Sequence, residues 1–211
     1  ALQGQVAGVN ITASSGAPGA ASNIRIRGIS TNGNNNPLIL VDGNVIEDLS
    51  VVNPSDIESI NVLKDATAGI YGVRGANGVI LITTKSGRKN TDFKVVLNTY
   101  AGIQQTTRKI PMLNGTEYAL LANEAFAANA ESIPFPDVNT LGEGTDWQDE
   151  VFKDAFVLSS DFTINKGTDK SSYSFGASHL TQDGIVGASK ANFERTTLKF
   201  NFDTEILKKL K

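Results

Sequence analysis

Two arginines near the start of the chain are the clearest candidates for binding an anionic group. Arg25 and Arg27 are two residues apart, so on a β-strand they share one face, with Ile24 and Ile26 on the other. Guanidinium groups donate strong, often bidentate hydrogen bonds to carboxylates. Two interpretations stay open, an anchor to carboxylates on a neighbouring protein surface and a solvated charged strand face.

An amide-rich loop follows the arginines. It contains Asn32, Asn34, Asn35 and Asn36 and ends at Pro37. Amide side chains offer both donors and acceptors, which suits recognition of sugar hydroxyls or peptide groups. Asn and Gly are also ordinary turn residues, so a plain mobile turn is the alternative to a substrate-facing loop.

Catalytic and metal-binding patterns are missing from the sequence. The glycines between Gly69 and Gly78 do not have the spacing of a phosphate-binding loop, and no Lys-Ser or Lys-Thr stands directly after any of them. Asp42 and Asp65 have no evident nucleophile or base as a partner. The chain has no cysteine and one histidine, His179, which is interpreted as a surface residue. We therefore predict a protein that is not an enzyme and uses no metal or cofactor.

Composition excludes some classes of protein and leaves others open. The 211 residues include 19 Lys and Arg against 22 Asp and Glu, a formal net charge of −3, without the basic excess typical of nucleic-acid binders. No apolar run approaches the 18 or so residues of a transmembrane helix. Transmembrane β-strands stay possible, since they need only about ten residues of alternating polarity.

The residues before about position 88 predict a small α/β unit. Short β-like runs lie at Val9–Ala13, Ile24–Gly28, Pro37–Asp42, Val45–Ile46, Glu58–Leu63 and Val79–Thr84. Asp42-Gly43-Asn44 indicates a hairpin turn. Asn53 and Pro54 suit the start of a short helix, and Ala66–Tyr71 predicts a helical turn stopped by Gly72. The β-branched run Val79–Thr84 is typical of a strand buried on both faces.

The residues after that point change to strict alternation. Four strands are predicted at Phe93–Ile103, Phe156–Ile164, Ser171–Leu180 and Arg195–Thr204. A tight turn at Gly167–Lys170 contrasts with long connections on the other side, including a predicted helix over Asn114–Ser132. Short turns on one side and long loops on the other are typical of outer-membrane barrels. The alternation alone also fits a soluble β-sandwich, and Trp147 fits either an aromatic girdle or packing under the long loop.

Several motifs together resemble the SusC/RagA family of TonB-dependent transporters. The resemblance runs through Leu2–Val9, Ser15–Gly19, Ile24–Gly28, Pro37–Gly43, Asn53–Ile60, Thr145–Phe152 and Asp183–Val186. Its most specific block is Val62–Lys85, which is similar to the family's plug-to-barrel signature almost residue for residue. The resemblance covers essentially the whole chain.

The resemblance implies a fold and a division of the chain. Residues 1–87 would form an α+β plug domain, a small mixed sheet with short helices, whose N-terminal part is missing. Residues 88–211 would begin a transmembrane β-barrel, with a long extracellular first loop at about 110–155. The family's barrel has about 22 strands, of which about four are here, too few to close a barrel. Arg25, Arg27 and Arg74 would anchor the plug in the barrel.

The resemblance also implies a function. Such a protein sits in the outer membrane of Bacteroidota, with its plug in the barrel lumen, reached from the periplasm. It imports a large nutrient, an oligosaccharide or a peptide, with a SusD-like lipoprotein as lid and the TonB–ExbB–ExbD complex as energy source. Two alternatives from other classes stay open, a signal-transducing outer-membrane receptor and a soluble β-rich binding or adhesion module.

Overall fold

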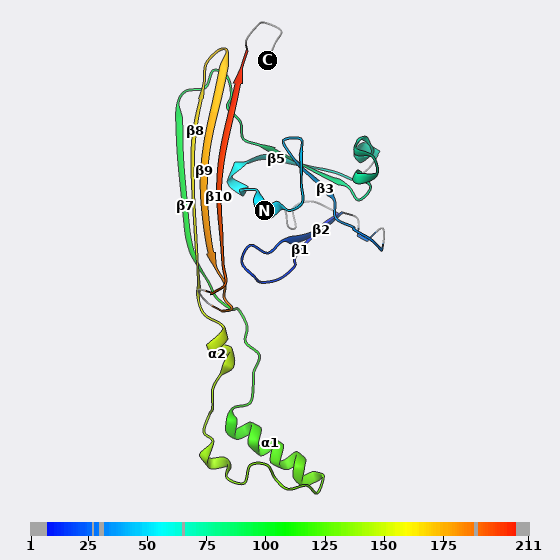
Figure 1. Cartoon of the computed structure of the whole chain (residues 1–211), viewed down its shortest axis with the longest axis vertical. Coiled ribbons are helices and arrows are strands. Elements are labelled where there is room, and N and C mark those ends of the chain that lie inside the picture. Colours follow the sequence, from blue (N-terminus) through cyan, green and yellow to red (C-terminus); the bar gives the residue numbers. More distant parts are fainter. Residues whose placement is uncertain (1–7, 27, 30–31, 65, 188–189, 206–211) are drawn as a thin grey trace.

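The computed structural model describes residues 8–26, 28–29, 32–64, 66–187 and 190–205. A long sheet of four strands stands beside an N-terminal unit built from two smaller sheets, and a helical arm projects beyond one end of the long sheet (Figure 1). We call that end of the sheet the arm end. The opposite end, where β8 turns into β9, is the turn end.

The N-terminal unit is organised around a mixed four-stranded sheet. Its strands are β3 (Leu38–Val41), β4 (Asn44–Ile46), β5 (Ile57–Leu63) and β6 (Val79–Thr84), in the order β4-β3-β6-β5. β6 pairs in parallel with β3 and antiparallel with β5. The predicted strands and the mixed sheet are therefore confirmed, while the parallel pairing of β3 with β6 was not foreseen.

β6 is the buried centre of this unit. On one face, Ile80 and Ile82 pack against the hairpin of β1 (Val9–Ala13) and β2 (Ser22–Ile26). On the other face, Val79 packs against Ala68 of the 3₁₀ segment η3 (Ala66–Gly75). Val79 and Ile80 are both 0% exposed. The prediction of a strand buried on both faces is confirmed.

Short polar motifs close the loops of the unit. Asp42 and Gly43, with φ of 49° and 85°, form the two-residue turn between β3 and β4, because a type I′ turn needs positive φ at both positions. Asn53 caps η2 (Pro54–Asp56) by accepting from the Ser55 amide at 3.2 Å, as predicted. An unforeseen 3₁₀ turn, η1 (Leu49–Val51), precedes it. The sequence predicted that the helical turn stops at Gly72; η3 kinks at that residue and continues to Gly75.

The long sheet contains the four predicted alternating strands. They are β7 (Lys94–Gln104), β8 (Ala155–Gly167), β9 (Ser171–Asp183) and β10 (Asn192–Thr204), all antiparallel and in chain order. β8, β9 and β10 each run 13 residues and extend past their predicted ends. The backbone ladder continues through polar residues such as Gln182 and Asp183, where apolar alternation has already stopped.

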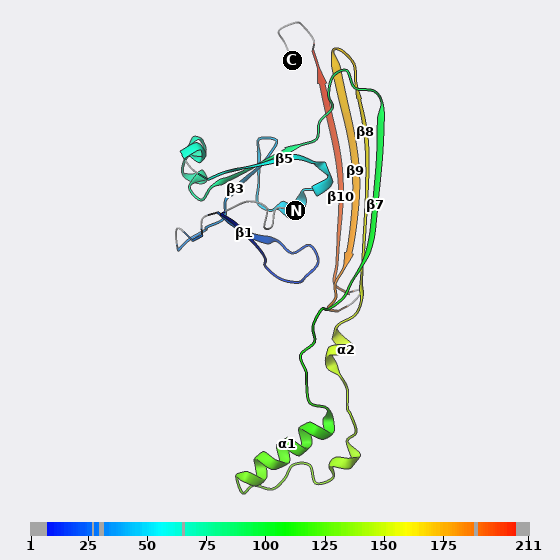
Figure 2. The ribbon, with the colours of Figure 1, turned by 180° about the vertical axis from the view of Figure 1, so that it is seen from behind.

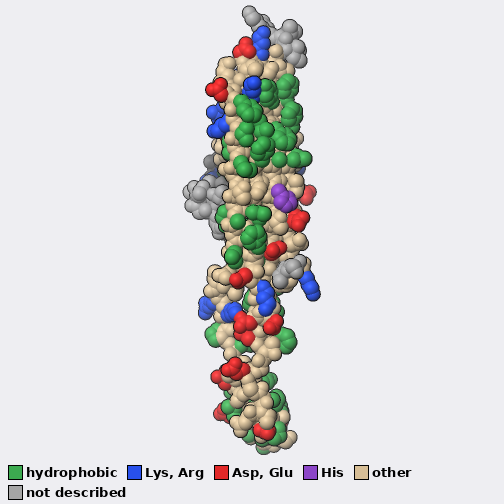
Figure 3. All heavy atoms as spheres, turned by 90° about the vertical axis from the view of Figure 1, so that its left-hand side faces the viewer, with side chains coloured by type: hydrophobic (Ala, Val, Ile, Leu, Met, Phe, Trp, Pro, Cys, Tyr) green, Lys and Arg blue, Asp and Glu red, His purple; other side chains and the backbone are tan. Residues whose placement is uncertain are grey.

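The two faces of the long sheet differ in chemistry. On the face away from the N-terminal unit, Leu97, Phe162, Ala177 and Leu198 form one row across all four strands. Leu198 is 71% exposed, and Figure 3 shows apolar side chains gathered on this face. The inward face carries mainly small and polar side chains, with Phe193 of β10 as an apolar exception. Alternation therefore places a wide apolar surface outside and a wet surface toward the unit.

A helical arm joins β7 to β8 (Figure 2). It contains α1 (Gly115–Ala128), η4 (Val138–Thr140) and α2 (Trp147–Val151). Asn114 and Glu117 form a reciprocal capping box that starts α1. α1 ends at Ala128, before the predicted Ser132, because Asn129 caps it and Ala130 has a φ of 57°. α2 was not predicted, and its Trp147 lies exposed on the arm and not in a strand.

None of the helices in the described ranges is long and apolar enough to cross a membrane.

Candidate functional site: the seam between the N-terminal unit and the long sheet

A polar seam joins the N-terminal unit to the long sheet. Its main component is the inward column of β10, by which we mean Phe193, Arg195, Lys199 and Asn201. The Phe193 ring covers Gly19 so closely that a Cβ at that glycine would lie 2.2 Å from a ring carbon. The other three side chains donate hydrogen bonds to the unit. One strand of the long sheet therefore contacts three separate segments of the unit.

Arg195 binds main-chain oxygens around η1. Its Nη1 donates to the carbonyl oxygen of Ser50 and, at 3.2 Å, to that of Val52. The ends of short helices leave carbonyl oxygens without helical partners, and a guanidinium group can satisfy several at once. Arg195 thus supplies a hydrogen-bond donor to carbonyl oxygens around η1 that have no helical partner, and so holds this loop in place.

Lys199 binds the end of β6 and, through it, the β3–β4 turn. Its Nζ donates to Thr84 Oγ1 and, at 2.7 Å, to the Lys85 carbonyl oxygen. Thr84 Oγ1 donates onward to Asp42 Oδ2 at 2.5 Å, and Asn201 Nδ2 donates to the Lys85 carbonyl at 3.4 Å. The chain of bonds runs from the long sheet into the centre of the unit. The sequence showed no catalytic partner for Asp42, and in the structure its carboxylate accepts the hydrogen bond from Thr84.

Asn53 links η2 to β8. Its Nδ2 donates to Asp161 Oδ1 at 2.5 Å, while its own Oδ1 caps η2. Asn53 is only 5% exposed. A single buried amide therefore holds the loop in shape and attaches it to the long sheet.

Small residues let the backbone of the unit approach β9. Ser172, Ser174 and Gly176 are all buried on the inward face of this strand. Ser172 Oγ donates to the Gly87 carbonyl at 3.1 Å. A Cβ at Gly87 would lie within about 3.0 Å of backbone atoms of Tyr173. Side chains larger than these would hold the two parts of the chain apart.

Asp56 places a carboxyl group inside the seam. Burial raises its pKa above the ordinary carboxyl value, and the neighbouring Asp161 raises it further. Lys199, Lys85 and Arg195 act in the opposite direction without cancelling the shift. Keeping the Asp56 carboxylate charged inside the seam therefore costs desolvation free energy.

Replacing Asp56 by Asn is expected to strengthen the docking of η2 at neutral pH. Because the pKa is higher when docked than when free, the carboxyl group opposes docking above its docked pKa, and this penalty disappears as the pH falls. Hydrogen exchange of the η2 amides in the intact protein, corrected for intrinsic rates, measures the effect. The variant should be better protected than the parent at neutral pH, with the difference closing under acidic conditions. Weaker protection in the variant at neutral pH would show that attraction to Lys199 dominates.

The arginines singled out in the sequence lie away from these contacts. Arg25 is exposed on β2, and Arg74 is exposed in η3, on the side of the unit away from the long sheet (Figures 1 and 2). Arg27 lies outside the described residues. Their anchoring role stays a prediction. The contacts described above include those of Arg195, Lys199 and Asn53, whose role in joining the unit to the long sheet the sequence did not predict.

The amide loop 32–36 is an exposed turn that bonds to itself. The Asn36 amide donates to Asn34 Oδ1 at 2.9 Å, and Asn77 Nδ2 donates to the Asn34 carbonyl oxygen at 2.8 Å. The loop is thereby tied to the start of β6. Several of its amide groups still face solvent, so both interpretations from the sequence stay open.

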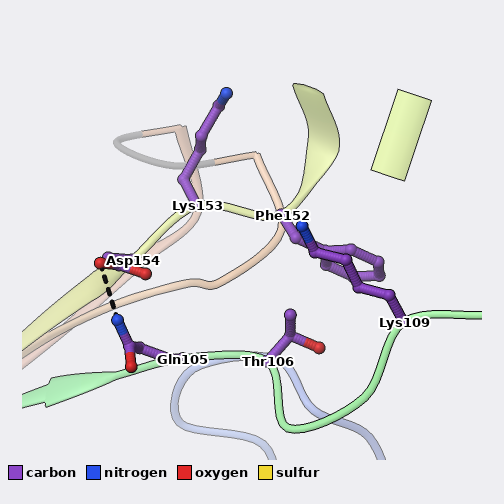
Figure 4. Close-up of a pocket in the computed structure, with 6 residues that line it drawn as sticks. All are labelled: Gln105, Thr106, Lys109, Phe152, Lys153 and Asp154. Carbon is purple, nitrogen blue, oxygen red and sulfur yellow. Dashed lines mark hydrogen bonds between the residues drawn. The ribbon is translucent and has the colours of Figure 1, made fainter. Parts of the chain in front are cut away.

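A hollow lies at the root of the arm (Figure 4). It has a volume of about 260 Å³ and is lined by Gln105, Thr106, Lys109, Phe152, Lys153 and Asp154. Gln105 Nε2 donates to Asp154 Oδ2 at 2.9 Å, and Lys109 is ion-paired with Asp149. The hollow offers no pairing of nucleophile and base. No group of three or more potential metal ligands occurs in the part of the chain that the structure describes.

Comparison with known proteins gives consistent matches. The TonB-dependent Receptor Plug Domain family matches residues 1–79. The chain is 39% identical over 218 residues to TonB-dependent receptor P26 of Formosa agariphila, covering 100% of this chain and 22% of that protein. It is 38% identical over 211 residues to TonB-dependent receptor SusC of Bacteroides thetaiotaomicron, covering 95% of this chain and 20% of SusC. The chain thus spans about a fifth of the length of these relatives.

Solved structures share the fold. A chain of the RagAB peptide transporter superposes with a TM-score of 0.85 at 29% identity, covering 98% of this chain and 27% of that one. The siderophore receptor PirA from Acinetobacter baumannii has a TM-score of 0.56 at 18% identity, covering 95% and 26%. The second match shows likeness of fold alone. In both, the likeness extends over the N-terminal unit and the long sheet together.

Proposed function

We propose that this chain, which belongs to the TonB-dependent receptors related to SusC and RagA, gates the import of a large nutrient across the outer membrane. The N-terminal unit, roughly residues 1–87, acts as the plug. The long sheet, within residues 88–211, is part of the barrel wall around it. The role is transport and not catalysis.

The seam is the observation that carries this proposal. Apart from the packing of Phe193 on Gly19, its contacts described above are hydrogen bonds between polar groups, as in Asn53 with Asp161 and Lys199 with Lys85. Each of these bonds has one charged partner, and such bonds contribute only about 1.5–3 kcal/mol each in net free energy. The apolar core of the plug is separate, around Ile80. The plug can therefore leave the wall in a water-filled lumen without unfolding its core first.

The outward face of the wall supports a place in the membrane. Leu97, Leu198 and Phe200 are all more than two-thirds exposed and lie on the side away from the plug. A transmembrane barrel turns such a face to lipid. The arm, about residues 110–155, would then be extracellular, and the turn end would face the periplasm.

Partners and substrates follow from the family. SusC and RagA relatives imply a SusD-like lipoprotein over the barrel and energy from TonB–ExbB–ExbD. RagAB is described as a peptide importer. The substrate of this protein belongs to the oligosaccharides or the peptides, which are too large for passive pores.

Growth of the source bacterium on a panel of oligosaccharides and peptides tests the function. Deleting the gene should abolish growth on one class of these nutrients, and deleting TonB should have the same effect. Full growth of the gene deletion on every nutrient, or growth that survives loss of TonB, would contradict energy-coupled import.

The arginines of the plug remain proposed anchors. Replacing Arg25 and Arg27 together by Ala should loosen the plug and raise passive leakage of large antibiotics through the intact transporter, because two charge-assisted contacts are lost. Arg25, Arg27 and Arg74 would each contact a part of the barrel wall other than the four described strands. Unchanged leakage together with unchanged hydrogen-exchange protection of the plug would count against anchoring.

The loop 32–36 is proposed to contact substrate. Its amide groups, those of Asn32, Asn34, Asn35 and Asn36, suit hydroxyl or peptide groups equally. A structure of the transporter with bound nutrient decides the matter, since a loop on the periplasmic side of the plug would exclude contact.

A further inference from the structure

The connection between β9 and β10 contacts both the arm and the plug. Its residues 184–187, which we call the bridge segment, follow β9 at the arm end of the long sheet. Residues 151–153, where the arm returns to the sheet, are called the arm root. Figure 4 shows the β9–β10 connection passing beside Phe152 of the arm root. One short segment therefore lies between an outer part of the molecule and the plug.

The bridge segment pairs with the arm root through main-chain groups. The Lys153 amide donates to the Ile185 carbonyl oxygen at 2.9 Å, and the Gly187 amide donates to the Val151 carbonyl oxygen at 3.4 Å. The residues between these partners form an isolated antiparallel β-bridge. Because the pairing joins one backbone to the other, a shift of the arm root displaces the bridge segment or breaks these bonds.

The bridge segment also packs against the tip of the β1–β2 hairpin. A Cβ at Gly184 would lie 3.2 Å from Pro18 Cγ and 2.9 Å from Ala191 Cβ, so the backbone at Gly184 approaches both residues closely. The next residue of the tip, Gly19, lies under the Phe193 ring. The bridge segment and the start of β10 therefore hold the tip together.

The tip itself is braced by hydrogen bonds. The Ser14 amide donates to the Ala21 carbonyl oxygen at 3.3 Å, and the Ala20 amide donates to the Ala17 carbonyl oxygen at 3.2 Å. Ser14 Oγ also donates to the Ala21 carbonyl oxygen. Coupling between distant parts of a protein is carried by such continuous packing and hydrogen bonding. A displacement at Pro18 is therefore passed on to β1 and β2.

We propose that the arm regulates the plug through the bridge segment. In the arrangement described, the arm root holds the bridge segment against Pro18 and so keeps the hairpin tip on the wall. Displacement of the arm root breaks the pairing at Ile185, frees the bridge segment and loosens the tip. The regulatory role rests on the proposed function, in which the hairpin is part of the plug. The coupling itself can be measured without transport.

Lys153→Pro in the intact, detergent-purified transporter tests the coupling. Proline has no amide hydrogen and removes the bond to Ile185, and the φ of −89° and ψ of 118° at Phe152 are compatible with a following proline. Hydrogen exchange of the tip, residues 14–21, should become about fivefold faster or more, the lower end of the usual coupling between sites. Exchange of the β6 amides should stay unchanged, which shows that the plug core is intact.

Lys153→Ala is the matched control. It removes the same side chain, whose Nζ donates to the Asp149 carbonyl oxygen at 2.8 Å, but it keeps the main-chain amide. Exchange at the tip should therefore stay at the level of the parent protein. An effect equal to that of Lys153→Pro would show that the main-chain pairing is not the route and would overturn the proposal.

Pro18→Ala tests the coupling from the opposite end. It removes the ring atom that approaches Gly184 and places no proline in the wall. Coupling is reciprocal, so the arm root should exchange faster by a similar factor. In cells, Lys153→Pro should raise passive leakage of large antibiotics above that of Lys153→Ala. Unchanged exchange at the far end in both variants, or unchanged leakage despite coupling, would overturn the proposal. The exchange experiments need no import, so their failure would leave the proposed function standing.

Discussion

Joining position 53 of the plug to position 161 of the wall is expected to abolish import by the intact transporter, and reduction is expected to restore it. Cysteines replace Asn53 and Asp161, whose side chains are in direct contact. A short bis-methanethiosulfonate reagent bridges them through reducible bonds. If the plug must leave the wall at this seam, the bridge should lower uptake of the labelled nutrient to the level of cells without the transporter.

A bridge within the wall is the matched control. Ala177 and Leu198 are paired neighbours on β9 and β10 and face away from the plug. Cysteines there can be bridged by the same reagent without crossing the seam, and import should persist. The 211 residues contain no cysteine of their own, so they add no background reaction. Undiminished import with complete bridging of positions 53 and 161 would show that the path opens elsewhere.

Truncating Ile80 to Ala is expected to destabilise the plug by about 2–5 kcal/mol, the usual cost of such a cavity in a packed core. Ile80 is 0% exposed at the centre of the mixed sheet, against the β1–β2 hairpin. Hydrogen exchange of the β6 amides in the intact transporter measures the loss.

Val73→Ala provides the comparison for Ile80. Val73 is in the same plug but 92% exposed, so its truncation should change stability by less than about 0.5 kcal/mol. Strand amides of the wall should keep their protection in both variants, since neither residue contacts β7–β10. Equal effects of the two substitutions would mean that the mixed sheet is not the stabilising core.

The elements that sequence could predict are those specified by neighbouring residues. Alternation in a strand such as Arg195–Thr204 records which face is apolar, so all four wall strands were found. The Asp42-Gly43 turn and the Asn53-Pro54 cap carry their own backbone signals. The parallel pairing of β3 with β6 has no local signal, because about forty residues separate the strands and only tertiary packing brings them together.

The seam could not be read from local pattern for the same reason. Arg195 contacts Ser50 across 145 residues, and Lys199 contacts Thr84 across 115. In the sequence each is simply one polar member of an alternating strand. Arg25 and Arg27 drew attention because they are adjacent on a face. The signal in the sequence was that Arg195 and Lys199 are long side chains on a strand face that otherwise carries shorter polar residues such as Thr197 and Asn201.

The contacts of the inward column enter the plug at separate points of its chain. Phe193 contacts Gly19, Arg195 contacts the segment 50–52, and Lys199 contacts Thr84 and Lys85. The order along β10, from the arm end to the turn end, is also the order along the plug chain. A pull through the chain at the start of β1 tilts the folded plug, so it loads most strongly the contact nearest to that point along the chain, that of Gly19 with Phe193. Attachments that are loaded unequally yield one after another, so the peak force stays below the sum of all of them. A seam that is firm at rest can thus be dismantled by a weak motor that pulls far enough.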